Sequence, residues 1–577
     1  MLCGGDLTEA KSELMVADQE EAEWREYRDI VDTRWEDVAW LDIRGNHDTL
    51  NVLSRSSHNN YYANYSVMGR QGFLNSYKVK LKSRNQKFNI IAIDATWELG
   101  LNYPFNFVGY IDDKEQESLE RMVSDIAQDE ITVMFGHYPT SVVRQYDYIR
   151  NLISRSLVYM SGHLHDLAFF KIFNMYSFHD DRDLELELVD WKNNRRFRVF
   201  AVDDGKLSFT DVKFNEWPIA LITYPKNVQF MMSTKEDYSD YKENTIRVLV
   251  FHTLVIKRVT IGVDDEDEME ASHVEDGPLY ILPWDSTKYN SGVHKITVRV
   301  VDEKDQVKVF TQDFTLNPNE AVMFSKAGPN FVLRSSFSLL FHTLFGLTLA
   351  FNIIIPVALK VLFYLAQTGK LSPNQRNILR KVCSFAIARK LMLIVSHNVI
   401  YFSLLAFMLY MALGPWVIGS LVDGNIGALF AWGALVSKKL VHSQVPFAYY
   451  FVHFGIIHPV MVFAIGHVLD YRHGQVTGTI QTTMCGHILH AVLLILMMSG
   501  SIFLSITFWL QHGVLGFFLG PLKTWSYLFY SVMFVLAWKT KTEIFTNYSR
   551  VISRESKEKK NDDEEEEIPG SDHELLS

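Results

Sequence analysis

The chain has 577 residues, of which 48% are hydrophobic and 21% charged, and its formal net charge is −11 at pH 7. That negative charge argues against a general nucleic-acid-binding protein, which would carry a basic stripe, so we expect no nucleic-acid partner. The mean hydropathy of 0.00 combines two different halves. Residues 1–330 carry most of the charge, whereas residues 337–538 contain apolar runs of about 20 residues, long enough to cross a bilayer. This pattern excludes a simple soluble enzyme.

Strands and helices alternate in the first part of the chain. Apolar runs at residues 87–94, 131–135 and 157–160 predict buried strands, and residues 112–127 have the pattern of an amphipathic helix. Alternation of this kind predicts an α/β layered sheet with its chemistry at the carboxyl ends of the strands. The run Leu-Glu-Leu-Glu-Leu at 184–188 alternates with period two and predicts a half-buried strand.

A strand-rich region follows. Residues 197–214 predict a hairpin folded at Asp203-Asp204-Gly205. Short strands then recur between about 215 and 325, clearest at 245–250 and 295–301. This spacing predicts an all-β, immunoglobulin-like sandwich that lacks a disulfide, since the region contains no cysteine.

The second half predicts a multi-span α-helical membrane domain. The loop after the first candidate span is rich in lysine and arginine without an acid, which places it in the cytoplasm by the positive-inside rule. Residues 1–335 would then be lumenal or extracellular, and a basic tail favours a cytoplasmic C-terminus. Six full crossings would place the C-terminus outside the cytoplasm. We therefore expect that one of the six candidate segments does not cross, and the number of spans stays at five or six. The candidates are 337–365, 391–413, 416–436, 446–469, 488–510 and 514–538.

Four short polar motifs stand out in the first domain. They are Gly5-Asp6, Gly45-Asn46-His47-Asp48, Gly136-His137 and Gly162-His163-Leu164-His165. Each follows or ends an apolar run, so all four could meet along one edge of a sheet. Carboxylate, carboxamide and imidazole together suit divalent manganese, zinc or iron, and a metal pair can activate water against a phosphoryl group. Any one of these histidines alone would be explained more simply as a core or surface residue.

Taken together, the motifs resemble those of the calcineurin-like metallophosphoesterase superfamily, whose pattern is D-x-H, G-D, G-N-H-[DE], G-H and G-H-x-H. The resemblance covers about the first 185 residues and implies a sandwich of two mixed sheets flanked by helices. It also implies a role for each residue. By resemblance, Asp6 is the ligand that bridges the two metals, and His165 is a ligand of the first metal. The other ligands of the second metal are Asn46, His137 and His163. The catalytic pair is His47, which contacts the phosphate and helps to protonate the leaving group, and Asp48, which follows it.

The chain departs from the family pattern at its beginning. The D-x-H motif should precede Asp6 by a few dozen residues, and only five residues precede it. We therefore expect an N-terminally truncated form with one complete metal site and one incomplete site. Two functions remain open: a membrane-anchored phosphoester hydrolase of unknown substrate, active in the full-length form, or a non-catalytic receptor or scaffold with a degenerate domain. The expected domains are 1–214 (phosphoesterase), 215–325 (immunoglobulin-like), 333–538 (membrane) and 539–577 (disordered acidic cytoplasmic tail).

Smaller signals concern processing and sorting. Asn64 begins a glycosylation sequon in the lumenal half, which makes it more credible than the sequon at Asn547 in the tail. Histidines within the spans are interpreted as partners in interhelical hydrogen bonds. The tail ends in a sequence similar to the D-x-x-L-L signal that clathrin adaptors read, formed here by Asp572, Leu575 and Leu576.

Overall fold

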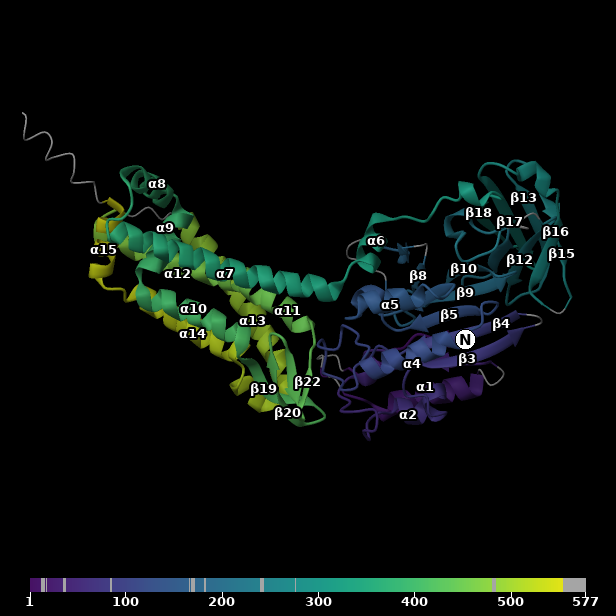
Figure 1. The fold of residues 1–577 in the computed structure, drawn as a ribbon, viewed down its shortest axis with the longest axis horizontal. Helices are drawn as coiled ribbons and strands as arrows, with labels where there is room; N and C mark the ends of the chain where they lie inside the picture. Colours follow the sequence, from purple (N-terminus) through teal and green to yellow (C-terminus); the bar gives the residue numbers. More distant parts are fainter. Residues whose placement is uncertain are drawn as a thin grey trace, which may run out of the picture. The chain divides into compact units, whose positions relative to one another are not determined.

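The computed structural model describes residues 1–11, 16, 18–34, 38–83, 86–165, 167, 172–180, 183–238, 243–275, 277–479 and 484–553 (Figure 1). The chain forms two compact units, Met1–Leu340 and Phe341–Ser577. The predicted sorting signal at Asp572, Leu575 and Leu576 lies outside the described residues.

A six-stranded mixed sheet forms the centre of the first unit, in the order β3-β4-β5-β6-β8-β7. Strands β4, β5, β6 and β8 are parallel, and β3 and β7 are antiparallel edge strands. The predicted strands and the predicted helix are confirmed. The bounds are β3 Tyr77–Ser83, β4 Gln86–Ile93, β5 Ile131–Gly136, β6 Val158–Ser161, β7 Tyr176–Phe178, β8 Leu184–Glu187 and the helix α4 Asp113–Ser124.

A second, two-stranded parallel sheet pairs β1 (Leu2–Cys3) with β2 (Leu41–Asp42). Helix α1 (Glu21–Arg34) lies between them in the chain and buries Trp24 and Val31. Short helices complete this part of the unit: η1 His47–Thr49, α2 Tyr62–Tyr65, α3 Val67–Arg70, η2 Thr140–Val142 and α5 Tyr146–Ile153. The polar motifs follow the carboxyl ends of β1, β2, β5 and β6, as expected from the sequence.

The prediction of a half-buried strand at 184–188 is wrong about burial. All four residues of β8 are buried, including Glu185 and Glu187 at 0% and 1% exposure. Their carboxylates are retained inside because neighbouring backbone and side-chain groups donate hydrogen bonds to them. The hairpin prediction is confirmed by β9 (Arg196–Asp203) and β10 (Lys206–Lys213), with left-handed backbone at Asp204 and Gly205.

Two four-stranded antiparallel sheets, β11-β12-β16-β15 and β14-β13-β17-β18, form the immunoglobulin-like sandwich (Figure 1). One apolar core, including Val248, Ile261 and Val298, lies between them. The bounds are β11 Ile219–Tyr224, β12 Thr245–Phe251, β13 Ile256–Val263, β14 Met269–Glu270, β15 Ser272–His273, β16 Leu279–Pro283, β17 His294–Asp302 and β18 Val307–Phe314, with turns η5 Val228–Phe230, η6 Ser286–Tyr289 and η7 Pro318–Glu320.

Helix α6 (Ala327–Arg334) returns from the sandwich to the phosphoesterase-like sheet, where it buries Val332 and Leu333. Ser177 of β7 donates a hydrogen bond to Asn330 Oδ1 at 3.0 Å. The long apolar helix α7 begins at Phe337, three residues after α6 ends.

Helices dominate the second unit. Among the residues that the structure describes, three helical segments are long and apolar enough to cross a membrane: Phe337–Gln367, Val445–Thr477 and Met484–Phe503. A fourth crossing is available if Ala386–Ser396 and Asn398–Leu413, bent by 94° at His397, count as one span. The bounds are α7 Phe337–Gln367, α8 Pro373–Ser384, α9 Ala386–Ser396, α10 Asn398–Leu413, α11 Val445–Tyr450, η8 Phe451–Ile457, α12 His458–Thr477, α13 Met484–Phe518, η9 Pro521–Trp525, α14 Ser526–Trp538 and α15 Thr542–Ser553.

The candidate span at 416–436 is not a helix. It forms most of a four-stranded antiparallel sheet, β19 (Pro415–Val422), β20 (Asn425–Phe430), β21 (Gly433–Val436) and β22 (Lys439–Val441). Asp423 and Gly424 have left-handed backbone at the first turn, as do Ser437 and Lys438 at the last, which is the geometry of tight hairpins. Hydropathy alone does not separate such hairpins from an apolar helix.

The ends of the helical unit differ. Helices α8, α9 and α15 gather at one end, and the β19–β22 sheet lies at the other (Figure 1). Helix α15 occupies residues that were expected to belong to the disordered tail, and it buries Phe545, Tyr548 and Val551. An amphipathic apolar face of this kind gives the first part of the tail a packed structure.

Histidines link the helices of this unit, as the sequence interpretation expected. His458 Nδ1 lies 2.8 Å from the Tyr530 hydroxyl, which joins α12 to α14. His467 Nε2 lies 2.9 Å from His487 Nδ1, which joins α12 to α13.

Candidate functional site

The structure brings together side chains from all four motifs of the first unit. His137 Nε2 lies 2.9 Å from Asn46 Oδ1 and 3.0 Å from His163 Nδ1, and these two atoms lie 2.9 Å from each other. Asp6 Oδ1 lies 3.5 Å from His137 Nε2. The expectation of one shared sheet edge is wrong, because Asp6 and Asn46 follow β1 and β2 of the two-stranded sheet, whereas His137 and His163 follow β5 and β6 of the six-stranded sheet. The carboxyl ends of parallel strands from both sheets meet at this site.

The three closest atoms cannot all be joined by hydrogen bonds. His137 Nδ1 lies 2.9 Å from the Gly4 carbonyl oxygen, which only accepts, so Nδ1 carries the hydrogen and Nε2 presents a lone pair. If Asn46 presents its oxygen, two acceptors face each other. If Asn46 presents its nitrogen, His163 Nδ1 is mismatched in both tautomers. As a donor it faces the Asn46 donor, and as an acceptor it faces the lone pair of His137 Nε2. One side of the triangle is therefore unsatisfied in every arrangement.

A cation would satisfy all three atoms at once. Metal–ligand bonds of 2.0–2.2 Å place neighbouring octahedral ligands about 2.8–3.1 Å apart, which matches the sides of this triangle. Among the residues that the structure describes, no group of three histidine, cysteine or acidic side chains could hold a metal by itself. The fit to a divalent ion therefore depends on the carboxamide of Asn46, an oxygen donor suited to manganese or iron.

Burial keeps both imidazoles neutral, as metal ligands must be. It lowers the pKa of His137, with the Asp6 carboxylate acting in the opposite direction. It lowers the pKa of His163 further, well below the ordinary value, and the neighbouring His137 adds to this effect.

Two glycines allow the loops to approach this closely. Gly5 has a φ of +92°, and a Cβ there would lie 2.6 Å from the Gly45 nitrogen. A Cβ on Gly45 would lie 2.2 Å from Asp6 Oδ1 and 2.8 Å from His137 Nδ1. Any side chain at these positions would separate the predicted ligands, which explains why glycine precedes Asp6 and Asn46.

Asp48 is buried between the loop that carries Asp6 and the loop that carries Asn46. Its carboxylate accepts hydrogen bonds from the backbone nitrogens of Leu7, Thr8 and Gly45 at 3.1, 3.1 and 2.8 Å. Burial, followed by the charge of Asp6, raises the pKa of Asp48 to about 7. These contacts hold the Asp6 loop against the Asn46 loop, which is a positioning role.

His47 lies at the half-buried rim of the site. Its backbone nitrogen donates to Asp6 Oδ1 at 2.9 Å, and its Nδ1 lies 2.6 Å from the Glu9 carbonyl oxygen. The carbonyl fixes the hydrogen on Nδ1, which leaves Nε2 to meet a substrate oxygen.

His165 forms no hydrogen bond or ion pair with the other predicted ligands among the described residues. Its side chain is 40% exposed, and its Nδ1 lies 4.0 Å from Asp190 Oδ1. His163 and His165 have φ angles of +93° and +57°, so the motif between them is a strained turn.

Glu187 supports that turn and was missed in the sequence. Its Oε1 accepts hydrogen bonds from the backbone nitrogens of Leu164 and His165 at 2.6 and 3.0 Å, and its Oε2 accepts one from the Ser161 hydroxyl at 2.6 Å. Burial raises the pKa of Glu187 well above its ordinary value. A glutamate in an alternating strand normally indicates a solvent face, so the sequence carried no signal for this role.

Asn106 is a second residue that the sequence did not reveal. Its buried Nδ2 donates to the Asn46 carbonyl oxygen at 2.6 Å and fixes the backbone of that ligand.

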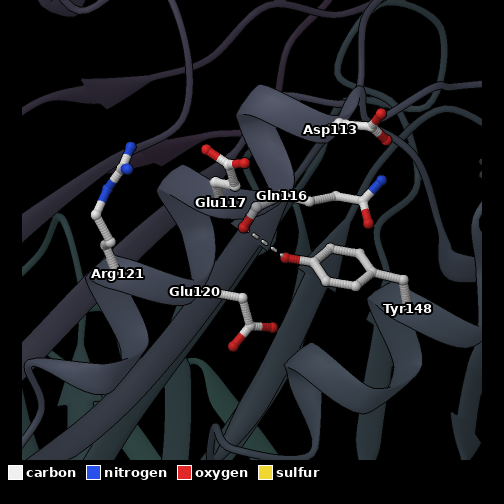
Figure 2. A pocket seen from close by; sticks show the side chains of 6 residues that line it. All are labelled: Asp113, Gln116, Glu117, Glu120, Arg121 and Tyr148. Atoms are coloured by element: carbon white, nitrogen blue, oxygen red, sulfur yellow. Dashed lines mark hydrogen bonds between the residues drawn. The ribbon is translucent and has the colours of Figure 1, made fainter.

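Figure 2 shows a separate surface hollow of about 500 Å³ on α4 and α5. Acidic side chains dominate its lining, which does not suit a phosphoester, and it contains none of the predicted site residues. It is lined by Asp113, Gln116, Glu117, Glu120, Arg121 and Tyr148.

Comparison with known proteins agrees with this three-part layout. Residues 1–167 match the calcineurin-like phosphoesterase family, residues 214–318 the TMEM62 Ig-like domain, and residues 338–474 the TMEM62 C-terminal domain. The chain is 31% identical to transmembrane protein 62 of Mus musculus over 554 residues, covering 93% of this chain and 82% of the mouse protein. The chain belongs to the transmembrane protein 62 family.

A second curated protein and one solved structure also match parts of the chain. The chain is 25% identical over 510 residues to an Arabidopsis thaliana protein named "Putative metallophosphoesterase", covering 73% of this chain and 66% of that protein. An engineered protein of known structure is 13% identical and covers 36% of this chain and 47% of its own, at a TM-score of 0.13. As a member of the transmembrane protein 62 family, the chain joins a metallophosphoesterase-like domain and an Ig-like domain to candidate membrane helices.

Proposed function

We propose that the first unit is a metal-dependent phosphoester hydrolase. The observation that supports this most directly is the triangle of His137 Nε2, Asn46 Oδ1 and His163 Nδ1, whose sides of 2.9–3.0 Å leave lone pairs facing one point. Calcineurin-like phosphoesterases generally use divalent metals, and the same donor set is present here.

Asp6, Asn46, His137 and His163 would hold the ion. A divalent manganese, zinc or iron bound there would polarise a phosphoryl oxygen and lower the pKa of a bound water. His47 acts on the substrate, since its Nε2 can donate a proton to the leaving oxygen once the ring is charged. Asp48 and Asn106 act as positioning residues for the loops that carry these groups.

Cations near His47 suit an anionic substrate. Lys11 Nζ lies 3.5 Å from Glu9 Oε1, and Lys192 pairs with Glu9 Oε2. The carbonyl of the same Glu9 binds His47. A phosphate group that enters beside His47 would meet both ammonium groups, which strengthens binding of a phosphomonoester or phosphodiester.

The membrane unit would place this site on the lumenal or extracellular side. The basic segment 368–390 indicates a cytoplasmic loop after α7. The three long helices and the bent pair supply four candidate crossings. A fifth, formed by η9 and α14 together, would give a cytoplasmic C-terminus. Asn64 is exposed and lies on the lumenal side in this arrangement.

A second candidate is a non-catalytic receptor or scaffold. The observation that favours it is the exposure of His165, whose side chain is 40% exposed and whose Nδ1 lies 4.0 Å from Asp190 Oδ1. A domain that holds one ion, or none, could retain its fold as a binding surface for a partner.

Metal and activity measurements on the full chain, purified in detergent, separate these functions. We expect one tightly bound ion by elemental analysis, lost in Asn46→Ala and His163→Ala. His47→Ala should retain the ion and reduce hydrolysis of a generic phosphodiester by about 10²–10⁴-fold. Glu117→Gln, an exposed substitution on α4, is the control and should change neither property.

Each alternative result has a defined meaning. Loss of the ion in His47→Ala would show that His47 is a ligand and not a proton donor. A wild-type protein that binds the ion without hydrolysing any phosphoester would favour the scaffold. A wild-type protein that binds no ion after dialysis against manganese, zinc or iron would contradict the proposed site itself.

A further inference from the structure

A buried lysine in the second unit has no acidic partner in the part of the chain that the structure describes. Lys523 lies in η9, the short π-helix between α13 and α14, and is 5% exposed. Only three acidic residues occur between residues 341 and 553, and one of them pairs with Arg389 at 2.7 Å. No carboxylate forms an ion pair with Lys523 within the described ranges. The three acids are Asp423, Asp470 and Glu543.

An imidazole without a partner lies near this lysine. His453 is 4% exposed, and neither of its ring nitrogens has a hydrogen-bond partner among the described residues. Strand β19 connects the two regions, because it packs against η9, which carries Lys523, and its Trp416 stacks on Tyr450 at a centroid distance of 6.5 Å. Tyr450 precedes His453 by three residues on the same helical stretch, is fully buried, and has a hydroxyl that is also without a partner in the described structure.

The backbone around these groups is unusual. His453 lies in the π-helix η8 and Lys523 in the π-helix η9. Such segments are rare and occur frequently at functional sites. Aromatic rings flank Tyr450: Phe454 stacks on it at a centroid distance of 4.6 Å, and Trp416 of β19 stacks on it at 6.5 Å.

We propose that Lys523, His453 and Tyr450 form a binding site for a small oxyanion of the phosphate class. The ammonium, the imidazole N–H and the phenol are all donors, and a phosphate oxygen accepts from each. The anion would also supply the negative charge that the described part of this unit does not provide to Lys523. A metal cation does not suit the site, because Lys523 would repel it.

Inorganic phosphate and a phospholipid headgroup present the same chemistry. A lipid phosphate would reach the site from the bilayer, whereas inorganic phosphate would enter from water beside the β19–β22 sheet. The site lies in the second unit, so the proposal does not depend on catalysis by the first.

The test uses the full chain in detergent, dialysed into phosphate-free buffer. Radiolabelled inorganic phosphate is titrated by equilibrium binding into the wild type and three variants. Lys523→Met should weaken binding by at least about tenfold, because it removes a charged hydrogen-bond donor, and Tyr450→Phe should weaken it by a smaller factor. Lys539→Met removes an exposed ammonium at the end of α14 and is the matched control, with unchanged binding.

A second measurement identifies a lipid source. Native mass spectrometry should show a phospholipid adduct on the wild type that is lost in Lys523→Met if the ligand is a headgroup. Binding of inorganic phosphate that depends on Lys523 supports a free anion. If neither probe depends on Lys523, the proposal is overturned, and water then occupies the region. Equal competition by chloride at matched ionic strength overturns the oxyanion class.

Thermal melting of the same samples checks that each variant is folded. Lys523→Met removes a buried charge, so in phosphate-free buffer it should melt at the same temperature as the wild type or higher. If that variant does not fold, Tyr450→Phe, which retains the ring, decides the question: phosphate affinity equal to the wild type overturns the proposal, and weaker affinity supports it.

Discussion

Arg150 donates a hydrogen bond from Nη2 to the Ser335 carbonyl oxygen at 2.9 Å, two residues before the first candidate membrane helix begins. The same guanidinium donates to the Leu333 carbonyl oxygen at 3.1 Å, and its Nε donates to the Thr140 hydroxyl at 3.3 Å. Thr140 follows His137 by three residues in the same loop. The end of α6 is therefore joined to a candidate metal-binding loop through one side chain.

Replacing this side chain tests the connection. Arg150→Met keeps the aliphatic stem but removes the donors, so we expect a loss of stability of about 1–3 kcal/mol and weaker metal binding. Arg150→Lys should fall between the variant and the wild type, because lysine cannot reproduce the forked geometry. The measurements are the melting temperature and the metal dissociation constant of the full chain. Arg155→Met, which breaks an exposed pair with Glu120, is the control, and equal metal affinity in all variants would show that α6 is only a structural support.

Two substitutions of Glu187 should differ in their effect on stability and metal binding. Glu187→Gln keeps an oxygen for the backbone nitrogens of Leu164 and His165, whereas Glu187→Ala leaves both without a partner. We expect the glutamine variant to bind metal nearly as well as the wild type, and the alanine variant to lose about 2–4 kcal/mol of stability together with most of its metal affinity. Elemental analysis and thermal melting measure these effects. An alanine variant that retains the ion would show that the strained turn at His163 holds its shape without Glu187.

Protonation of Asp94 should lower the stability of the protein in acid. It ends β4, is 1% exposed, and pairs with Arg44 and, at 3.1 Å, with Arg55. Burial alone would raise its pKa, but the two guanidinium groups lower the pKa of Asp94 to about 2, from 3.8. The folded pKa is the lower one, so the stabilisation is complete above about pH 4 and disappears as the pH falls toward 2; it amounts to roughly 2 kcal/mol.

The matching variant is Asp94→Asn. It should melt lower than the wild type at neutral pH, because two buried guanidinium groups lose their counter-charge. Its melting temperature should change less than that of the wild type between pH 4 and pH 3. Parallel melting curves for both proteins over this interval would contradict the assignment. Asp125→Asn, on an exposed pair with Lys78, controls for the loss of one surface charge.

The hairpin between β19 and β20 offers a test of membrane topology. Asp423→Asn combined with Asn425→Thr creates a glycosylation sequon at a turn whose backbone suits Asn-Gly. If the sheet faces the lumen, this variant gains a glycan, and Asn64→Gln loses the natural one. Asn547→Gln should leave the mass unchanged because α15 would be cytoplasmic. A glycan on Asn547, or none at the new sequon despite a folded protein, would contradict the five-crossing arrangement.

Apolar runs predicted the first domain well because its central strands are buried on both faces. Residues 87–94, 131–135 and 157–160 contain little except aliphatic and aromatic side chains, and they became β4, β5 and β6. The motifs after β5 and β6 marked strand ends, so the grouping of His137 and His163 followed from the order of parallel strands, whereas Asn46 joins them from the separate β1-β2 sheet. The position of His165 did not follow, because it depends on a left-handed turn that Glu187 supports.

The second half was harder to predict for a physical reason. A hydropathy window measures transfer into an apolar environment, and β19–β22 buries apolar residues such as Trp416 and Val422 against α13 and its neighbours. The glycines of this segment and Asp423 are the residues in the sequence that suit its turns. Similarly, a window cannot register the 94° bend at His397.

The hairpins of β19–β22 also set a condition on biosynthesis. As this segment leaves the ribosome, its apolar character makes entry into the bilayer compete with formation of the two tight turns. If the segment inserted, every later crossing would reverse its direction, and α15 with the tail would emerge on the opposite side of the membrane. The left-handed residues at 423–424 and 437–438 therefore do more than shape a small sheet. In the topology proposed above, closure of these hairpins would decide which side of the membrane receives the residues that follow β22.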